Sequence, residues 1–268
     1  MRKYWMTATG LLFAVISMQA QQKQGKVTYD RTVKLQFSFS GMPGGMEQQM
    51  PSSRTDKYEL VFGNNQSLWK QAEQENDDDG ASIGGEGMQV RMFVAGSNDV
   101  LYNNFDKGRR VEKRELFDKI FIIDDTITKL RWKMTGESKT ILNHNCMLAE
   151  AVRISKRMTM NMDNGKVERK EIDDTAKILA WFAMDIPVSA GPSEFQGQLP
   201  GLILELDIRN GDQVYKASSL SETADLAVVK EPTGKKKYTQ EEFKKERDKM
   251  LEEMSRNNSG GQRVIRMN

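Results

Sequence analysis

The carboxylates between residues 75 and 86 have the spacing of a calcium-binding loop. They are Glu75, Asp77, Asp79 and Glu86, which fall at positions 1, 3, 5 and 12 of such a loop. Oxygen ligands at this spacing wrap a hard cation, and the glycine at Gly80 permits the sharp turn. However, Ser82 stands where calcium loops have an apolar residue, and the residues after it alternate as in a strand. We therefore expect a solvated acidic loop, with a calcium site as the alternative.

A second candidate site consists of soft ligands. The chain has 17 methionines, and thioethers combined with a thiol or an imidazole suit Cu(I). The candidate copper ligands are Met42, Met46, Met50, His144 and Cys146. Methionine also packs adaptably at apolar contacts, so the alternative for the loop methionines is a contact surface for another protein or for lipid. We favour the contact surface.

The single histidine, His144, and the single cysteine, Cys146, are two residues apart, which would place them on one face of a strand. Nucleophilic catalysis would also need an orienting acid. The aspartate pairs at 124–125 and 173–174 are expected in polar turns, and the sequence contains no Gly-x-Ser-x-Gly or His-Glu-x-x-His motif. We therefore predict no catalytic residues and no cofactor, and expect Cys146 to be a buried free thiol.

Charge excludes one class of partner. The 268 residues include 40 Lys and Arg against 38 Asp and Glu. Arg2 and Lys3 lie in a segment that we expect to be removed, so the mature chain carries 40 − 2 = 38 bases and is formally neutral. Because nucleic-acid binding depends on neutralising phosphates with basic residues, we expect no nucleic-acid partner.

Apolar residues alternate with polar ones along much of the chain, which is the pattern of half-buried strands. In residues 26–40 the apolar side is interrupted once, by Arg31. The same period recurs at Tyr58, Leu60 and Phe62, at Leu130, Trp132 and Met134, and at Leu202, Leu204, Leu206 and Ile208. Turn signals at 64–65, 164–165 and 210–211 separate such runs. We predict a mainly β fold with a single antiparallel sheet, strongly twisted or half-barrel-like, whose core includes Trp132, Trp181 and Leu204.

The C-terminal part has a helical pattern instead. Thr239 precedes Glu242 by three residues, the spacing of a capping box. Phe243, Met250 and Met254 then repeat at helical spacing. We predict one amphipathic helix that ends near residue 255, preceded by a solvated basic run at 235–237.

Residues 1–20 have the layout of a secretory signal peptide, with a basic start at Arg2 and Lys3 and a small residue, Ala20, before the expected cleavage point. The apolar run at 6–16 is too short to cross a membrane, which takes about 20 residues. We expect secretion across the inner membrane to the periplasm or the periphery of the outer membrane. The mature chain is expected to have no transmembrane segment.

The most distinctive motif consists of Leu199, Pro200, Gly201, Leu202 and Ile203. Proline followed by glycine is typical of a type II turn, which predicts a positive φ at Gly201. With Ile141, Leu142 and Cys146 upstream, the stretch from 140 to 206 resembles the GLPGLI family of secreted Bacteroidetes proteins. Gln198 replaces the first glycine of that motif. Because the family has no established activity, the resemblance implies a compartment and a fold but no chemistry.

These patterns predict a signal peptide at 1–20, a β-sheet domain at 21–230 with flexible loops at 41–53 and 71–87, and a C-terminal helix and tail at 231–268. We interpret the protein as a non-catalytic interaction or binding module of the cell envelope that contacts other envelope proteins. The first alternative is a periplasmic half-barrel carrier of an apolar ligand, and the second is a Met-rich copper-binding protein. A largely apolar pocket on the inner side of the sheet would favour the carrier.

We expect the leader to be cut after Ala20, because the small residue there follows the apolar run. N-terminal sequencing of the exported protein should begin at or next to Gln21. A mature chain that keeps residues 6–16 would contradict the removal of the leader on export.

Overall fold

The computed structural model describes residues 23–34, 53–73, 82–83, 90–91, 98–163 and 166–259. The strands are β1 (Gly25–Lys34), β2 (Ser53–Gly63), β3 (Gln66–Gln71), β4 (Ser82–Ile83), β5 (Val90–Arg91), β6 (Val100–Asn104), β7 (Arg109–Leu116), β8 (Lys119–Thr126), β9 (Lys133–Ile141), β10 (His144–Asp163), β11 (Lys166–Ala183), β12 (Leu202–Ile208), β13 (Gln213–Ser221) and β14 (Lys237–Tyr238). The helices are η2 (Ser193–Phe195), η3 (Leu226–Val228) and α1 (Gln240–Ser259).

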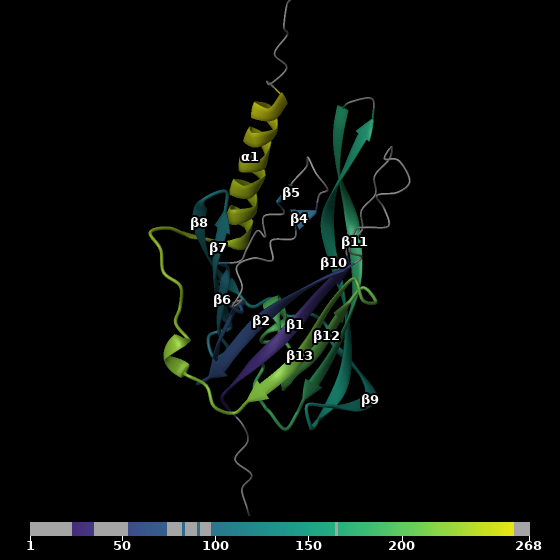
Figure 1. The fold of residues 1–268 in the computed structure, drawn as a ribbon, viewed down its shortest axis with the longest axis vertical. Helices are drawn as coiled ribbons and strands as arrows, with labels where there is room; N and C mark the ends of the chain where they lie inside the picture. The colour runs from purple at the N-terminus through teal and green to yellow at the C-terminus, as the bar shows by residue number, and fades with distance from the viewer. Residues whose placement is uncertain are drawn as a thin grey trace, which may run out of the picture.

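Within these residues, twelve strands form one sheet in the order β14-β8-β7-β6-β3-β2-β1-β13-β12-β11-β10-β9. Neighbouring strands are antiparallel except β14 and β8, which are parallel. In Figure 1 the strands β1, β2, β12 and β13 cross the front, with β6–β8 on one side and β10–β11 on the other. This arrangement confirms the predicted mainly antiparallel sheet with one C-terminal helix.

Strand alternation places the core where the sequence predicts it. The inner face of the sheet, defined by Val27 and Tyr29 of β1 and by Leu60 of β2, is fully buried. Leu204 and its neighbours in β12 are buried in the same cluster, whereas Trp132 and Trp181 are half-buried and pack against its border. The predicted core is therefore confirmed in β12 and only partly correct for the two tryptophans.

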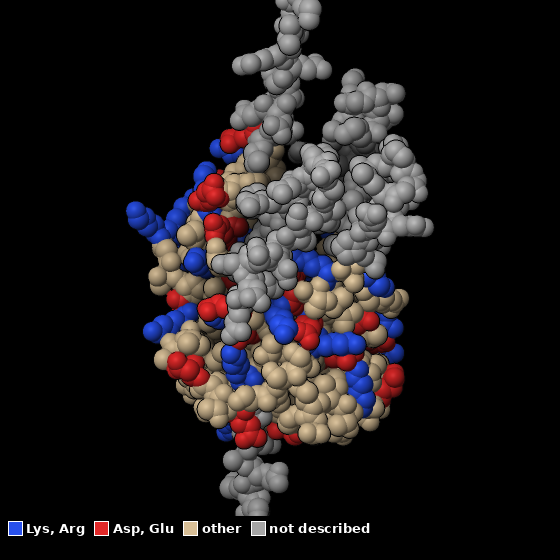
Figure 2. All heavy atoms as spheres, in the orientation of Figure 1, with Lys and Arg blue, Asp and Glu red and all other residues tan. Residues whose placement is uncertain are grey.

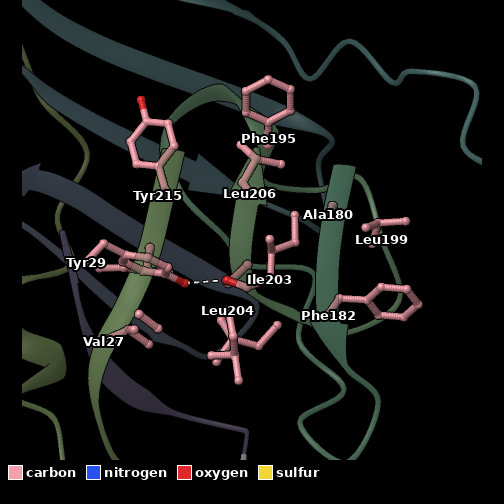
Figure 3. Packing of buried hydrophobic residues seen from close by; sticks show 14 of the residues in the cluster. Val27, Tyr29, Ala180, Phe182, Phe195, Leu199, Ile203, Leu204, Leu206 and Tyr215 are labelled. Carbon is pink, nitrogen blue, oxygen red and sulfur yellow. Dashed lines mark hydrogen bonds between the residues drawn. The ribbon is translucent and has the colours of Figure 1, made fainter. Parts of the chain in front are cut away.

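The segment 184–201, between β11 and β12, packs against this inner face instead of running through solvent. Its apolar residues Ile186, Val188, Phe195 and Leu199 belong to the same buried cluster. Figure 3 shows Phe195 beside Leu206. The same figure shows the hydroxyl of Tyr29, which donates a 2.5 Å hydrogen bond to the carbonyl of Ile203. The inner face is thus covered by the chain itself.

Gly201 lies in this segment, but its φ is not positive, so the turn geometry predicted from Pro200 is wrong. Position 201 requires glycine because two backbone segments approach each other closely there. A Cβ on Gly201 would lie 2.2 Å from the carbonyl oxygen of Ala183. Other sites have the left-handed turn geometry that the sequence predicts, including Asn64 and Asn65 between β2 and β3. The turn at 210–211 is likewise left-handed, and 164–165 lie outside the described residues.

The predicted strand around Leu130 begins later than expected, at Lys133. The physical reason is a side chain that takes the place of a strand partner. The amide of Leu130 and the indole of Trp132 both donate to Oε1 of Gln198, at 2.9 and 3.2 Å, and Nε2 of Gln198 donates to the carbonyl of Thr128. Gln198 therefore fixes the connection 127–132 to the inner segment.

The C-terminal region continues from β13 along the opposite face of the sheet to α1. Val229 packs there on a second cluster formed by Leu68, Tyr102, Val111 and Ile122. The predicted capping box is confirmed: Thr239 Oγ1 accepts from the amide of Glu242, whose carboxylate accepts from the amide of Thr239. Helix α1 runs to Ser259, one turn past the predicted end, and buries Phe243 against Phe121.

An ion cluster holds the C-terminal region to the edge of the sheet. Arg109 binds both Asp124 and Glu231 with two hydrogen bonds each, and Lys237 bridges the same two carboxylates at 2.9 and 3.1 Å. These bonds lower the pKa of Asp124 to about 2, with the hydrogen bond from Arg109 as the main cause. The basic run 235–237 is exposed, as expected, although Lys237 is also paired. The expectation of polar turns at 124–125 and 173–174 is wrong, because these aspartates lie within β8 and β11.

Replacing Gly201 by alanine should destabilise the protein by about 2 kcal/mol or more, because the added methyl group meets a backbone carbonyl that cannot rotate away. Gly136 is the matched control: it has a φ of 86° and no atom within 4 Å of an added Cβ. Gly136→Ala should cost only about 1 kcal/mol of conformational strain. Urea unfolding of both variants measures the difference, and equal losses would contradict the close approach.

Candidate binding cleft

A cleft of about 470 Å³ opens on the inner side of the sheet, where the central strands meet the 193–194 turn and the start of α1. Its lining residues are Arg31, Tyr58, Trp69, Asp99, Val100, Leu101, Arg110, Glu112, Arg114, Ser193, Glu194, Gln213, Tyr215 and Gln240. The lining is mostly charged or polar, and its volume suits a small molecule. The cleft is therefore the candidate binding site.

Aromatic side chains form one wall of the cleft. Tyr58 stacks on Trp69 with ring centres 5.0 Å apart and planes at 7°, and Tyr215 meets the edge of Trp69 at 5.9 Å. Burial raises the pKa of Tyr215 to about 12, with a further contribution from Glu194. The oxygen of Tyr215 accepts a 2.5 Å hydrogen bond from Gln213, and Ser193 is a further hydrogen-bond partner of the hydroxyl.

A second wall holds ion pairs on β7. Arg110 and Arg114 both bind the buried carboxylate of Glu112, and Arg114 also lies 3.7 Å from Asp99. Desolvation raises the pKa of Asp99 despite a hydrogen bond from a backbone amide. The guanidinium of Arg114 stacks over Phe243 at 5.2 Å, so this wall also fixes the start of α1.

Arg31 lies between these walls, and its polar contacts are longer than those of Arg110 and Arg114. Its Nη1 is 3.3 Å from the hydroxyl of Tyr58 and 3.9 Å from Asp56. The other oxygen of Asp56 is bound by Arg54 at 2.6 Å. The Nε of Arg31 is buried, and no described residue forms a hydrogen bond with it. Arg31 is therefore the lining cation with the least complete neutralisation by described residues.

Of the residues proposed as metal ligands, His144 and Cys146 are described, and neither lines this cleft. Glu75, Asp77, Asp79, Glu86, Met42, Met46 and Met50 are outside the described residues. In β10, Nδ1 of His144 lies 2.7 Å from Asp185, and the buried thiol of Cys146 lies 3.6 Å from the carbonyl of His144. Across the described ranges, no group of three His, Cys, Asp or Glu side chains is arranged to hold a metal.

The motif residues Leu199, Gly201, Leu202 and Ile203 are buried packing residues, and Pro200 is exposed. None of the five lines the cleft. They act through the segment they terminate, because it carries Ser193 and Glu194 into the cleft wall. Sequence reasoning missed the cleft residues, although the interruption of an apolar stripe by Arg31 was a signal that could have found one of them.

The face of the molecule seen in Figure 2 shows no dominance of one charge among its described residues. Figure 2 shows Lys and Arg interspersed with Asp and Glu over the visible face. No helix in the described part of the chain is long and apolar enough to cross a membrane.

Comparisons with known proteins give one family model and two structures of one protein. Residues 132–205, less than half of the chain, match the model of a family described as "Protein of unknown function (Porph_ging)". No curated protein matches the chain. Two crystal forms of PNGF-II, in space groups C2 and P21, are similar at 17% identity with TM-scores of 0.46 and 0.47, over 81% and 80% of this chain. The chain spans only 31% of the length of PNGF-II.

Cys146 should resist alkylation in the folded protein and react once in denaturant. Its side chain is fully buried, and burial, followed by the charge of Asp185, raises the pKa of the thiol to about 11, so the reactive thiolate is scarce near neutral pH. Mass spectrometry after iodoacetamide treatment measures the reaction. Rapid labelling without denaturant, a dimer that dissociates on reduction, or protection by added Cu(I) would each contradict a buried free thiol.

Proposed function

We propose that the protein is an exported, non-catalytic binding module of the cell envelope and that its polar cleft is the binding site. The leader pattern of residues 1–20 supports export, and the resemblance to the GLPGLI family points to the same compartment. The main support for the proposal is a preformed cleft whose polar side chains are held in place by packing and ion pairs.

Two carboxylates of the cleft, those of Glu112 and Glu194, are held in ion pairs, which favours binding over catalytic turnover. Glu112 is held by two guanidinium groups, and Glu194 accepts hydrogen bonds from Arg153 and Ser193. A general acid or base needs a position from which it can exchange a proton with substrate. Glu112 instead positions Arg110 and Arg114, and Glu194 is held by Arg153 from outside the cleft lining.

The composition of the inner side favours a polar ligand over an apolar one. A carrier of an apolar molecule needs a lined apolar cavity, but the described inner face packs against Ile186, Phe195 and Leu199 of the chain itself. The cleft that remains is bordered by three arginines and three acids. We therefore place the binding module ahead of the carrier.

Native mass spectrometry of the protein, isolated gently from the envelope of the cells that make it, tests this proposal. Gln240 is exposed and lines the cleft, so Gln240→Trp should obstruct the cleft from its rim. Glu241→Trp is the matched control, because Glu241 lies in the same exposed turn but does not line the cleft. We expect a bound small molecule in the wild type and in Glu241→Trp, and its loss in Gln240→Trp.

Each other outcome would contradict the proposal in a recognisable way. A bound acyl lipid that survives in Gln240→Trp would indicate the carrier, and a bound copper ion would indicate the metal protein. Absence of any ligand from all three proteins, or chemical conversion of the ligand by the wild type, would overturn a non-catalytic binding cleft.

A further inference from the structure

We propose that the cleft binds its ligand through a carboxylate group held by the guanidinium of Arg31. This inference rests on the binding role proposed for the cleft and names the chemical class of its ligand.

The first observation is the incomplete pairing of Arg31. A guanidinium has five N–H donors in a rigid fork. Among described residues, the polar partners of Arg31 are the hydroxyl of Tyr58 at 3.3 Å, over whose ring the guanidinium also lies, and Asp56 at 3.9 Å. Its buried Nε has no partner there. A buried donor without a partner is costly and is uncommon in native structures. Because Nε is enclosed by the protein, a carboxylate in the cleft would bind the Nη donors of Arg31, which also lack a full set of acceptors among described residues.

The second observation is the set of hydroxyl groups around Arg31. Strand register places Arg31 of β1 opposite Tyr215 of β13 and opposite Asp56 of β2, two residues from Tyr58. Tyr58 and Tyr215 line the same cleft. The hydroxyl of Tyr58 accepts from Nη1 of Arg31, so its proton can be donated to a ligand oxygen, and the hydroxyl of Tyr215 is held beside it by Gln213 and Ser193. One cation and nearby hydroxyl donors form a set that suits a planar anion.

Charge balance selects a carboxylate over a phosphate. Besides Arg31, the lining contains Arg110 and Arg114, which Glu112 already neutralises in part, together with Asp99 and Glu194. A doubly charged phosphate would be repelled by these acids. A single negative charge offsets Arg31, whose one acidic partner among described residues, Asp56, lies 3.9 Å away and is shared with Arg54. The cleft volume leaves room for the remainder of a small molecule.

The minimal probe is acetate, because it tests the site without knowledge of the whole ligand. In the ¹⁵N-labelled mature protein, acetate should produce a saturable shift of the Arg31 Nε–H resonance and of the Trp69 indole resonance. Acetamide, which is neutral, and sodium chloride at equal ionic strength should not. A response to acetate no different from that to chloride, or an equal response to acetamide or inorganic phosphate, would overturn the inference.

Two arginine variants localise the effect. Arg31 and Arg54 both pair with Asp56, but only Arg31 lines the cleft. Followed at the Trp69 indole, acetate affinity should fall at least tenfold in Arg31→Gln and stay unchanged in Arg54→Gln. Arg31→Lys should lie between, since it keeps the charge and loses the fork. Equal losses in Arg31→Gln and Arg54→Gln would contradict a direct contact.

Two further arms identify the source of the carboxylate. Tri-alanine is compared with its C-terminal amide, and glucuronate with glucose. Preference for tri-alanine over its amide supports a peptide terminus, and preference for glucuronate over glucose supports a small organic acid. If the native protein carries a cleft ligand without an acidic group, the carboxylate inference fails while the binding role stands. If it carries no ligand at all, the binding role fails first.

Discussion

Residues 184–201 return along the inner face of the sheet, and their packing there fixes both the core and the position of the cleft. The segment closes on β12 through the amides of Leu202 and Ile203, which donate to the carbonyls of Ile186 and Ala190 at 3.1 and 3.0 Å. This closure is possible because Gly201 has no side chain where the two backbones meet. One glycine thereby allows the chain to cover its own sheet and to place the 193–194 turn in the cleft wall.

The C-terminal region completes the cleft from the other side. Its ion cluster attaches Glu231 and Lys237 to the edge strands, and β14 then aligns the capping box of α1. The start of the helix contributes Gln240 to the rim of the cleft, and the ring of Phe243 packs against the guanidinium of Arg114. The ion cluster at the edge of the sheet therefore helps to set the geometry of the cleft, although the cleft lies over the central strands. Acid that protonates Asp124, whose pKa is about 2, and Glu231, whose pKa is also lowered, would remove this attachment.

Local patterns in the sequence were sufficient for the elements but not for their assembly. Alternation around Tyr29 and Leu204 and the Thr239–Glu242 spacing each report on a few neighbouring residues, so strands and helix could be predicted. The cleft depends on strand register, which brings Arg31 beside Tyr215 across 184 residues of sequence, and no local pattern encodes this pairing. Proline before Gly201 suggested a turn, whereas the requirement for glycine comes from Ala183, a residue on another strand. Likewise, Gln198 acts through bonds to residues about 70 positions away.

Amide hydrogen exchange at Gly197 and Ile203 measures whether residues 184–201 belong to the folded core. The amide of Gly197 donates to the carbonyl of Ser189 at 2.6 Å and that of Ile203 to Ala190, so neither bond belongs to the sheet ladder. If residues 184–201 are an integral part of the core, both amides exchange only by global unfolding, as slowly as the amide of Tyr29 in β1. Exchange of both amides orders of magnitude faster than that of Tyr29, at a rate typical of surface loops, would contradict the account.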